Sequence, residues 1–340
     1  MRLSLPLVIV ASLAGATAAS TAASAATLAA TPTTLEGALA RAKPGDTVVL
    51  GDGNYRGLRI VGRTFEPALT IEARAARVTG VELRDVKGVT LRGGQYHLPA
   101  PVKHPRNGSL VFGQTIRVDA SQGVKVIDAD VLGPGVLEAN GPFGDGYGVF
   151  VVRSSGIEVV SSRFRGFKTG IVLSKVDGFT MRANVFRAMR SDGIQIGEGR
   201  RGLIEDNDCG ATRIRDIEHP DCIQLWSRPT SPPTADIVIR RNRAVGTMQG
   251  VFLGNKVREG VDDGGFDRIT IEDNILDVGY PNGIAIEDGR NSVVRNNKVT
   301  TIAGARWRAS INLKRGDAKR CGNSVQAAAG RPSMQDDACK

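Results

Sequence analysis

The 340-residue sequence predicts an all-β solenoid, because one short phrase recurs through its C-terminal two-thirds. In each copy a Gly, Cys or Ser precedes an apolar–variable–apolar triplet, which is the alternation expected of a half-buried strand. The seven copies begin at Gly148, Gly170, Gly193, Cys222, Gly250, Gly283 and Ser310. Consecutive copies are 22 to 33 residues apart, and a period of that length is typical of stacked coils.

A second series of short apolar segments lies between the copies and supports the same architecture. The segments are residues 157–159, 179–181, 203–204, 237–239, 269–271 and 293–294. Each of the last five is followed by an asparagine, at Asn184, Asn207, Asn242, Asn274 and Asn297. An amide in a buried turn can satisfy backbone groups and bind its copy in the next coil, so we predict a structural asparagine ladder. Two or three short strands per coil, stacked in register, describe a parallel β-helix.

With these repeats, the chain resembles the right-handed β-helix superfamily of pectate lyases, polygalacturonases, chondroitinase B-like lyases and mannuronan epimerases. The resemblance covers residues 33–320. It implies a right-handed parallel β-helix of the pectin lyase-like type that acts on a polysaccharide. The run from Leu39 to Tyr55 also looks like the start of chondroitinase B-like and alginate lyases.

The first residues indicate export. Arg2 precedes an apolar stretch, and Ala23-Ser24-Ala25 is similar to a cleavage site, so residues 1–25 are interpreted as a signal peptide. No apolar stretch reaches the roughly 20 residues that a membrane span needs. We therefore expect a periplasmic or secreted protein that is soluble and does not bind membranes.

A short helix is expected between the signal peptide and the first coil. Thr33 and Glu36 have the spacing of a capping box, and Leu35, Leu39 and Ala42 share one helical face. Such a helix would cover the strand edges that an open β-helix end exposes. After the signal peptide, the predicted parts are a linker with an N-terminal capping helix at 26–46, a parallel β-helix at 47–320 and a C-terminal tail at 321–340.

Four cysteines fit an oxidising compartment. Cys222 occupies the Gly slot of a strand and Cys209 lies in the preceding turn, so a Cys209–Cys222 disulfide is plausible. A Cys321–Cys339 disulfide would then tie down the C-terminal tail. Zinc binding is the alternative, but no two cysteines have C-x-x-C spacing.

The charge balance suggests the partner. Lys and Arg outnumber Asp and Glu by 45 to 35, which gives a net charge of +10, and a basic protein with a long groove suits a polyanion. The basic residues are scattered, aromatic residues are few and no recognised nucleic-acid module is present. We therefore expect a monomer that binds an acidic polysaccharide and no nucleic acid.

Alignment of the copies places polar side chains on one outward-facing grid. The slot before the Gly position holds Asp192, Asp221, Gln249 and Asn282, and the slot two residues earlier holds Arg190, His219, Thr247 and Tyr280. If the chain bends after the Gly position, Gln195, Gln224, Phe252 and Ala285 face outward as well. Because neighbouring strands lie about 4.8 Å apart, Asp192 and Asp221 should be neighbours. Their repulsion would raise one pKa, which suits acid–base catalysis.

Two reaction classes use this grid. Ser191-Asp192-Gly193-Ile194 and Asp221-Cys222-Ile223 resemble the paired-aspartate strands of polygalacturonase-like hydrolases, which implies that Asp192 and Asp221 are acid and base. Those enzymes carry a Gly-His-Gly strand on the following coil, where this sequence has Gln249-Gly250-Val251. A hydrolase of this kind is therefore the alternative function.

The main hypothesis is β-elimination of a uronate-containing polysaccharide. Arg190 would neutralise the uronate carboxylate, His219 would be the base, and Tyr280 or an aspartate would be the acid. A uronate C5-epimerase shares the first step, and His219-Pro220-Asp221 holds the residues of the mannuronan epimerase motif in reversed order. A non-catalytic carbohydrate-binding β-helix is the remaining alternative.

Further residues are candidates for binding substrate or metal. Gln195 and Gln224 lie beside the aspartates, and Phe252 and Trp226 could stack on sugar rings. The candidates for anionic subsites are Lys168, Arg213, Arg215, Lys256 and Lys314. Calcium is common in the families that the chain resembles, and Asp192 with Asp221 could hold Ca²⁺.

Overall fold

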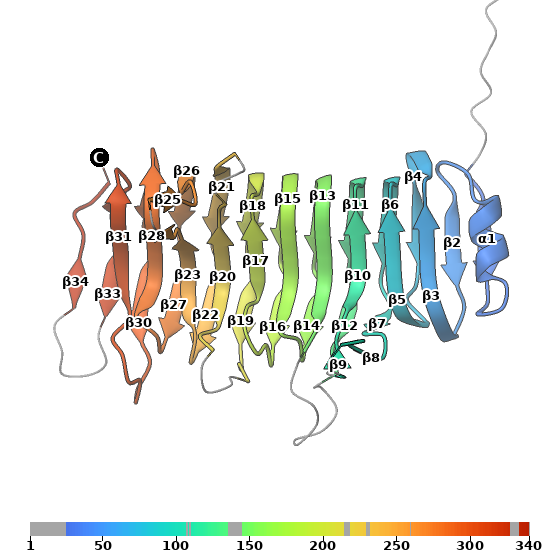
Figure 1. Ribbon diagram of the computed structural model, residues 1–340, viewed down its shortest axis with the longest axis horizontal. Coiled ribbons are helices and arrows are strands. Elements are labelled where there is room, and N and C mark those ends of the chain that lie inside the picture. The colour runs from blue at the N-terminus through green and yellow to red at the C-terminus, as the bar shows by residue number, and fades with distance from the viewer. Residues whose placement is uncertain are drawn as a thin grey trace, which may run out of the picture.

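The seven repeated phrases all form strands in the computed structural model. The structure describes residues 25–106, 108, 110–134, 145–213, 218–228, 232–258, 260–326 and 333–339. The first apolar residues of the phrases are successive partners in one parallel register, namely Val149, Ile171, Ile194, Ile223, Val251, Ile284 and Ile311. The predicted ladder is confirmed, and the coils stack into an elongated solenoid (Figure 1).

The strands form three parallel stacks along the solenoid. The first comprises β3 (Gly53–Val61), β5 (Ala76–Arg84), β10 (Gln114–Asp119), β13 (Tyr147–Val160), β15 (Thr169–Arg182), β17 (Ile194–Gly197), β20 (Asp221–Trp226), β23 (Gln249–Gly254), β28 (Asn282–Arg290) and β31 (Ser310–Gly316). The second comprises β1 (Thr27–Ala30), β2 (Thr47–Leu50), β4 (Thr64–Glu72), β6 (Lys87–Arg92), β11 (Gln122–Ile127), the second halves of β13 and β15, β18 (Arg200–Glu205), β21 (Thr234–Arg240), β26 (Phe266–Glu272), β29 (Val293–Arg295) and β32 (Lys319–Cys321).

The third stack comprises β7 (Gln95–His97), β12 (Asp130–Leu132), β14 (Arg163–Arg165), β16 (Val185–Arg187), β19 (Asp208–Gly210), β22 (Arg243–Gly246), β27 (Ile275–Val278), β30 (Lys298–Thr301) and β33 (Ser324–Gln326), and β34 (Met334–Gln335) pairs antiparallel with β33. Two antiparallel hairpins join no stack, β8 (Val102–Lys103) with β9 (Leu110–Val111) and β24 (Val257–Arg258) with β25 (Val261–Asp262). Strands β1 and β33 extend the stacks outside the predicted 47–320 range.

Inward apolar side chains fill the solenoid. In β13 the triplet Val149-Phe150-Val151 buries its two valines completely and leaves the phenylalanine half-buried, as alternation requires. Between coils, Phe164 and Phe186 stack with ring centroids 5.1 Å apart. Complete burial of one valine, leucine or isoleucine side chain contributes about 1.5–3 kcal/mol to the stability of the fold. The core therefore fixes which side chains face outward.

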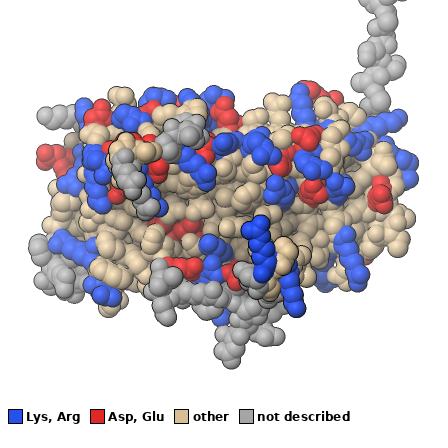
Figure 2. Space-filling model, in the orientation of Figure 1, with Lys and Arg blue, Asp and Glu red and all other residues tan. Residues whose placement is uncertain are grey.

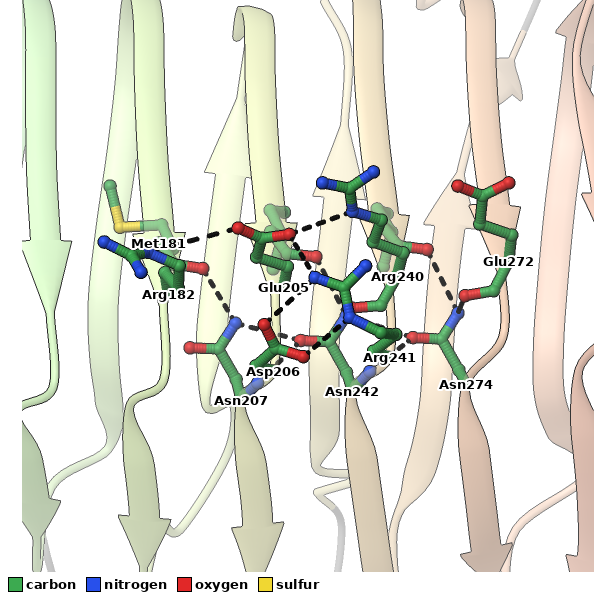
Figure 3. Close-up of polar contacts among 12 residues, drawn as sticks. Met181, Arg182, Glu205, Asp206, Asn207, Arg240, Arg241, Asn242, Glu272 and Asn274 are labelled. Carbon is green, nitrogen blue, oxygen red and sulfur yellow. Dashed lines mark hydrogen bonds and ion pairs between the residues drawn. The ribbon is translucent and has the colours of Figure 1, made fainter.

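The predicted asparagine ladder is present and is longer than expected (Figure 3). From the second member onward, the side-chain Oδ1 of each asparagine accepts hydrogen bonds of 2.8–3.0 Å from the backbone N–H and the Nδ2 of the asparagine in the preceding coil. Oδ1 of the first member, Asn184, accepts from the Ser162 N–H (3.0 Å). The members are Asn184, Asn207, Asn242, Asn274, Asn297 and Asn323. All six are buried, so the ladder satisfies turn groups that water cannot reach.

Opposite charges alternate outside the coils. Beside the ladder, Glu205 contacts Arg182, Arg240 and Arg241 (Figure 3), and Figure 2 shows basic and acidic side chains interleaved along the upper edge. Glu205 is itself buried, whereas pairs with both partners exposed, such as Arg59 with Glu82 (2.9 Å), each contribute little stability. They do neutralise much of the basic charge, so the net charge does not form one continuous basic surface on the face seen in Figure 2.

A helix, α1 (Leu35–Arg41), lies at the N-terminal end of the solenoid (Figure 1). Its buried side chains are Leu35, Ala38 and Leu39. The predicted capping box is wrong, because the N-cap is Thr34 rather than Thr33 and it makes no side-chain capping bond. The Thr34 hydroxyl instead accepts a hydrogen bond from the Thr31 N–H (2.9 Å).

Both predicted disulfides are present. Cys209 and Cys222 have Cα atoms 5.6 Å apart, and Cys321 and Cys339 have Cα atoms 5.0 Å apart. All four cysteines are therefore bonded, which removes the zinc alternative. The predicted signal peptide lies, apart from its last residue, outside the described residues. Among the helices that are described, none combines the length and apolar character needed to cross a bilayer.

Candidate active site

The two candidate aspartates lie in the same slot of neighbouring coils. Asp221 is the first residue of β20, and Asp192 lies two residues before β17. The Gly193 N–H donates to the Asp221 carbonyl (2.9 Å), and the Asp221 N–H donates to Oδ1 of Asp192 (3.2 Å). The register expected from the aligned copies therefore brings two carboxyl groups together.

Two glutamines hold this pair of carboxyl groups. Gln195 Nε2 donates to Asp192 Oδ2 (3.2 Å), and Gln224 Nε2 donates to Asp221 Oδ2 (2.9 Å). The amides also bind each other, from Gln195 Nε2 to Gln224 Oε1 (2.7 Å). The aspartates were predicted to face outward, but each residue is only 1% exposed, because this amide layer packs against them.

Burial changes the acidity of both aspartates. Loss of solvation raises the pKa of Asp192 well above its usual range, and the neighbouring charge of Asp221 raises it further. Loss of solvation also raises the pKa of Asp221 to about 6, although His219 opposes the rise. Asp221 Oδ1 is buried without a hydrogen-bond partner among the described residues. The pair therefore retains a proton at pH values where an exposed aspartate has none.

The slot continues as a chain of amides that ends at His219. Asn312 Nδ2 donates to Asn282 Oδ1 (2.9 Å), and Asn282 Nδ2 donates to Gln249 Oε1 (2.5 Å). Gln249 Nε2 lies 3.0 Å from His219 Nδ1. Gln249 and Asn282 thus share the predicted slot with the aspartates, and they hold one side of the imidazole.

His219 lies at the open edge of the pair, with 54% of its side chain exposed. Its Nδ1 is 3.7 Å from Asp221 Oδ2, and the Asp221 carboxylate raises the pKa of His219 while partial burial opposes the rise. The ring stands edge-on to Phe252, with centroids 6.4 Å apart. Since Nδ1 faces Asp221 and Gln249, Nε2 is the nitrogen left for a bound molecule.

Arg190 does not present its guanidinium to a substrate, contrary to the sequence-based expectation. Its side chain is only 8% exposed and forms ion pairs with Asp145 and with Glu218, the latter at 3.0 Å. Both carboxylates come from insertions between the repeated strands, residues 133–147 and 210–218. A cation already shared by two acids cannot also neutralise a uronate without breaking a buried pair.

Tyr280, the predicted acid, makes its side-chain contacts with Trp307 and Glu218. Its ring packs against Trp307 with centroids 4.9 Å apart, and its hydroxyl points to the carbonyl of Glu218 (3.4 Å). Tyr280 therefore supports the segment that leads into His219.

A cavity of about 270 Å³ opens beside the carboxyl pair. It is lined by Tyr147, Lys168, Ser191, Asp192, Gln195, Glu218, His219 and Gln224. The sequence reasoning missed Tyr147, Ser191 and Glu218, and their only signal is that each directly precedes a residue singled out by the repeat or the grid. A larger hollow of about 800 Å³ lies between α1 and β3, but its lining holds one carboxylate, Glu36, and no histidine.

The two predicted aromatic contacts lie outside the cavity lining. The Trp226 indole covers Gly197, where a Cβ would come within 2.2 Å of the ring, and the Arg228 guanidinium lies 4.6 Å from the Trp226 ring centroid. Phe252 covers Gly254 in the same way. Glycine at these two positions lets each ring lie flat along the outer face of the first stack.

Of the five predicted basic contacts, Lys168 lines the cavity, Lys256 is exposed and does not line it, and Lys314 forms an ion pair with Glu287 (3.2 Å). Arg215 lies outside the described residues.

The aspartate pair does not fit calcium. Ca²⁺ takes six to eight oxygen ligands, and the described residues contain no group of three or more His, Cys, Asp or Glu side chains placed for a metal. Three carboxyl oxygens already accept N–H groups from Gln195, Gln224 and the Asp221 backbone. These three oxygens are therefore already occupied by protein donors and are not free to bind a cation.

Comparison with known proteins places this geometry in a family. The family described as "Right handed beta helix region" matches residues 114–319, whereas no curated protein matches. Among solved structures, the tailspike protein gp208 of Dettilon has a TM-score of 0.56 at 15% identity, over 86% of this chain and 57% of its own.

PfbA, a surface adhesin of Streptococcus pneumoniae, has a TM-score of 0.56 at 12% identity, over 83% of this chain and 82% of its own. The tailspike of E. coli bacteriophage HK620, solved in complex with a pentasaccharide, has a TM-score of 0.50 at 14% identity, over 90% of this chain and 57% of its own. At these identities the likeness establishes the fold. Together with the family match and the observed coils, it shows that the chain belongs to the right-handed parallel β-helix superfamily.

Proposed function

We propose that this protein is an exported enzyme that cleaves an acidic, uronate-containing polysaccharide by β-elimination. The observation that carries the proposal is that one cavity is lined both by a buried carboxyl group with a raised pKa, Asp192, and by a half-exposed imidazole, His219. Elimination needs a base for the proton on C5 and an acid for the departing oxygen. These two side chains supply one of each.

In the proposed reaction, His219 directs Nδ1–H to Asp221 Oδ2 (3.7 Å) instead of accepting from Gln249 Nε2, so Nε2 is unprotonated and takes the proton from C5 of the uronate. The electron pair of that C–H bond forms the C4–C5 double bond, and the C4–O4 bond breaks. Asp192, which keeps its proton because it is buried, protonates the departing oxygen. Asp221 stabilises the imidazolium from the Nδ1 side at 3.7 Å.

A hydrolase that uses Asp192 and Asp221 is the second candidate, because the two carboxyl groups are neighbours and both have raised pKa values. Direct hydrolysis needs one carboxyl group as acid and the other as base or nucleophile, each in reach of the sugar. Only Asp192 lines the cavity, since Asp221 is covered by Gln224 and His219. This difference favours elimination.

Export is part of the proposal. Two disulfides in a chain of this kind suit a periplasmic or secreted protein. We also propose that α1 acts as a cap, because it buries Leu35 and Leu39 at the end of the coils, where strand edges would otherwise be open.

The test is to incubate the protein, expressed without residues 1–25, with a panel of uronate polymers and to follow ultraviolet absorbance and reducing ends. We expect both signals to rise together, because elimination leaves a double bond at each new end. Reducing ends without absorbance would support the hydrolase. Altered stereochemistry without cleavage would support an epimerase.

Two variants locate the chemistry. His219→Ala and Asp192→Asn should each remove the absorbance signal, whereas His104→Ala, outside the cavity lining, should not. Activity of His219→Ala equal to that of the wild type would remove the imidazole from the mechanism.

A further inference from the structure

We infer that Lys168 is the residue that recognises the acidic group of the sugar held in the cavity. This inference rests on the proposed function, and it assigns to Lys168 the specificity that sequence reasoning gave to Arg190.

The backbone of Lys168 is fixed between two coils. Its N–H donates to the carbonyl of Gly146 (3.1 Å), and its carbonyl accepts from the N–H of Ser191 (2.8 Å). Ser191 directly precedes Asp192, and Lys168 is the counterpart of Ser191 one coil earlier, whereas Phe167 is the counterpart of Arg190. The half-buried side chain lines the cavity together with Asp192 and His219.

The charges around the cavity leave Lys168 without a counter-charge. Glu218, the other charged residue of the lining besides Asp192 and His219, contacts Arg190 at 3.0 Å. Burial and the neighbouring Asp221 raise the pKa of Asp192 well above its usual range, which disfavours its charged form. Lys168 itself forms no ion pair with any residue in the described part of the chain.

Other lysines on the coils form ion pairs with a glutamate of a neighbouring coil. Lys125 contacts Glu158 (2.9 Å), and Lys314 contacts Glu287 (3.2 Å), each across neighbouring coils. A half-buried ammonium that lacks such a partner and faces a cavity is a site for an anion from outside the protein.

The volume of the cavity limits the size of the ligand that carries the anionic group. About 270 Å³ is below the range of roughly 300–1,000 Å³ for pockets that enclose drug-sized ligands. One sugar ring with its carboxylate therefore suits the space, with the rest of the polysaccharide outside it.

The experiment measures binding of trisaccharides of galacturonate, mannuronate, guluronate and glucuronate, and of their carboxyl-reduced neutral forms, by calorimetry. Lys168→Met should weaken binding of the preferred acidic trisaccharide at least tenfold, since a hydrogen bond to a charged group is lost. Lys168→Arg should stay within a few-fold of the wild type. Lys298→Met, which changes an exposed lysine outside the lining, is the matched control.

The inference would be overturned if Lys168→Met and the wild type bound the acidic trisaccharide with equal affinity. It would also be overturned if the wild type bound none of the acidic trisaccharides, or bound the neutral forms equally well. The proposed function fails separately. Lys168-dependent binding without any unsaturated product would keep this inference and reject the lyase reaction. If Lys168→Met formed as much unsaturated product as the wild type, the lyase reaction would be kept and the role of Lys168 rejected.

Discussion

Asp221→Asn should make the protein more stable at pH 8 and leave its stability nearly unchanged at pH 4. In the folded protein the pKa of Asp221 is about 6, compared with 3.8 for an unperturbed aspartate. A folded-state pKa above the unfolded one means that the folded protein loses stability as pH rises from about 4 to 6. About two pKa units correspond to at most about 3 kcal/mol above pH 6.

Asparagine suits the position sterically. Its oxygen can keep the hydrogen bond from Gln224 Nε2, and its nitrogen takes the place of Oδ1, which has no described partner. The assay is urea unfolding at pH 4, 6 and 8, and the variant's midpoint should exceed that of the wild type progressively with pH. An Asp221→Asn midpoint at or below the wild-type value at pH 8 would refute the assignment of a strained, buried carboxylate.

Three further outcomes are expected. Asn242→Ala should lower the free energy of unfolding in urea by at least about 3 kcal/mol, because it leaves several buried backbone and amide groups without partners. The control Asn54→Ala, at an exposed position, should lower it by under about 0.5 kcal/mol, and equal midpoints of the two variants would contradict the ladder's structural role. Arg190→Ala should lower the free energy of unfolding by about 3–5 kcal/mol, because it leaves the carboxylates of Asp145 and Glu218 without their cation. An unchanged unfolding midpoint would make Arg190 a candidate substrate contact again. His219→Ala should lower turnover at least about 10²-fold while changing the free energy of unfolding by at most about 1 kcal/mol, and a large loss of stability would show that the ring is structural.

Much of the fold was predictable because it repeats. Period-two alternation located the seven strands, and the Gly position then placed Asp192 and Asp221 side by side. The partners of Arg190 were not predictable, since Asp145 and Glu218 lie in insertions that follow no repeat. Because these insertions follow no repeat, sequence alone could not show that Arg190 is paired and that Lys168 has no ion pair among the described residues.

Burial and helix capping also escaped prediction, for local reasons. The aspartates occupy the predicted slot, yet the amide layer of Gln195 and Gln224 covers them. At the N-terminus, Thr33 and Thr34 are both good capping residues, and the structure begins the helix one residue later than the capping-box spacing suggested. Spacing identifies neighbours along a stack, whereas exposure depends on contacts between side chains that have no common period.

The uniform register of the coils has a consequence for how such a protein can diverge. Each coil bonds mainly to its two neighbours, and the carboxyl pair needs only the coils that carry β17 and β20. Whole coils could be gained or lost near either end of the chain without moving these two side chains relative to each other. The length of surface offered to a polymer can therefore change while the chemistry stays in place.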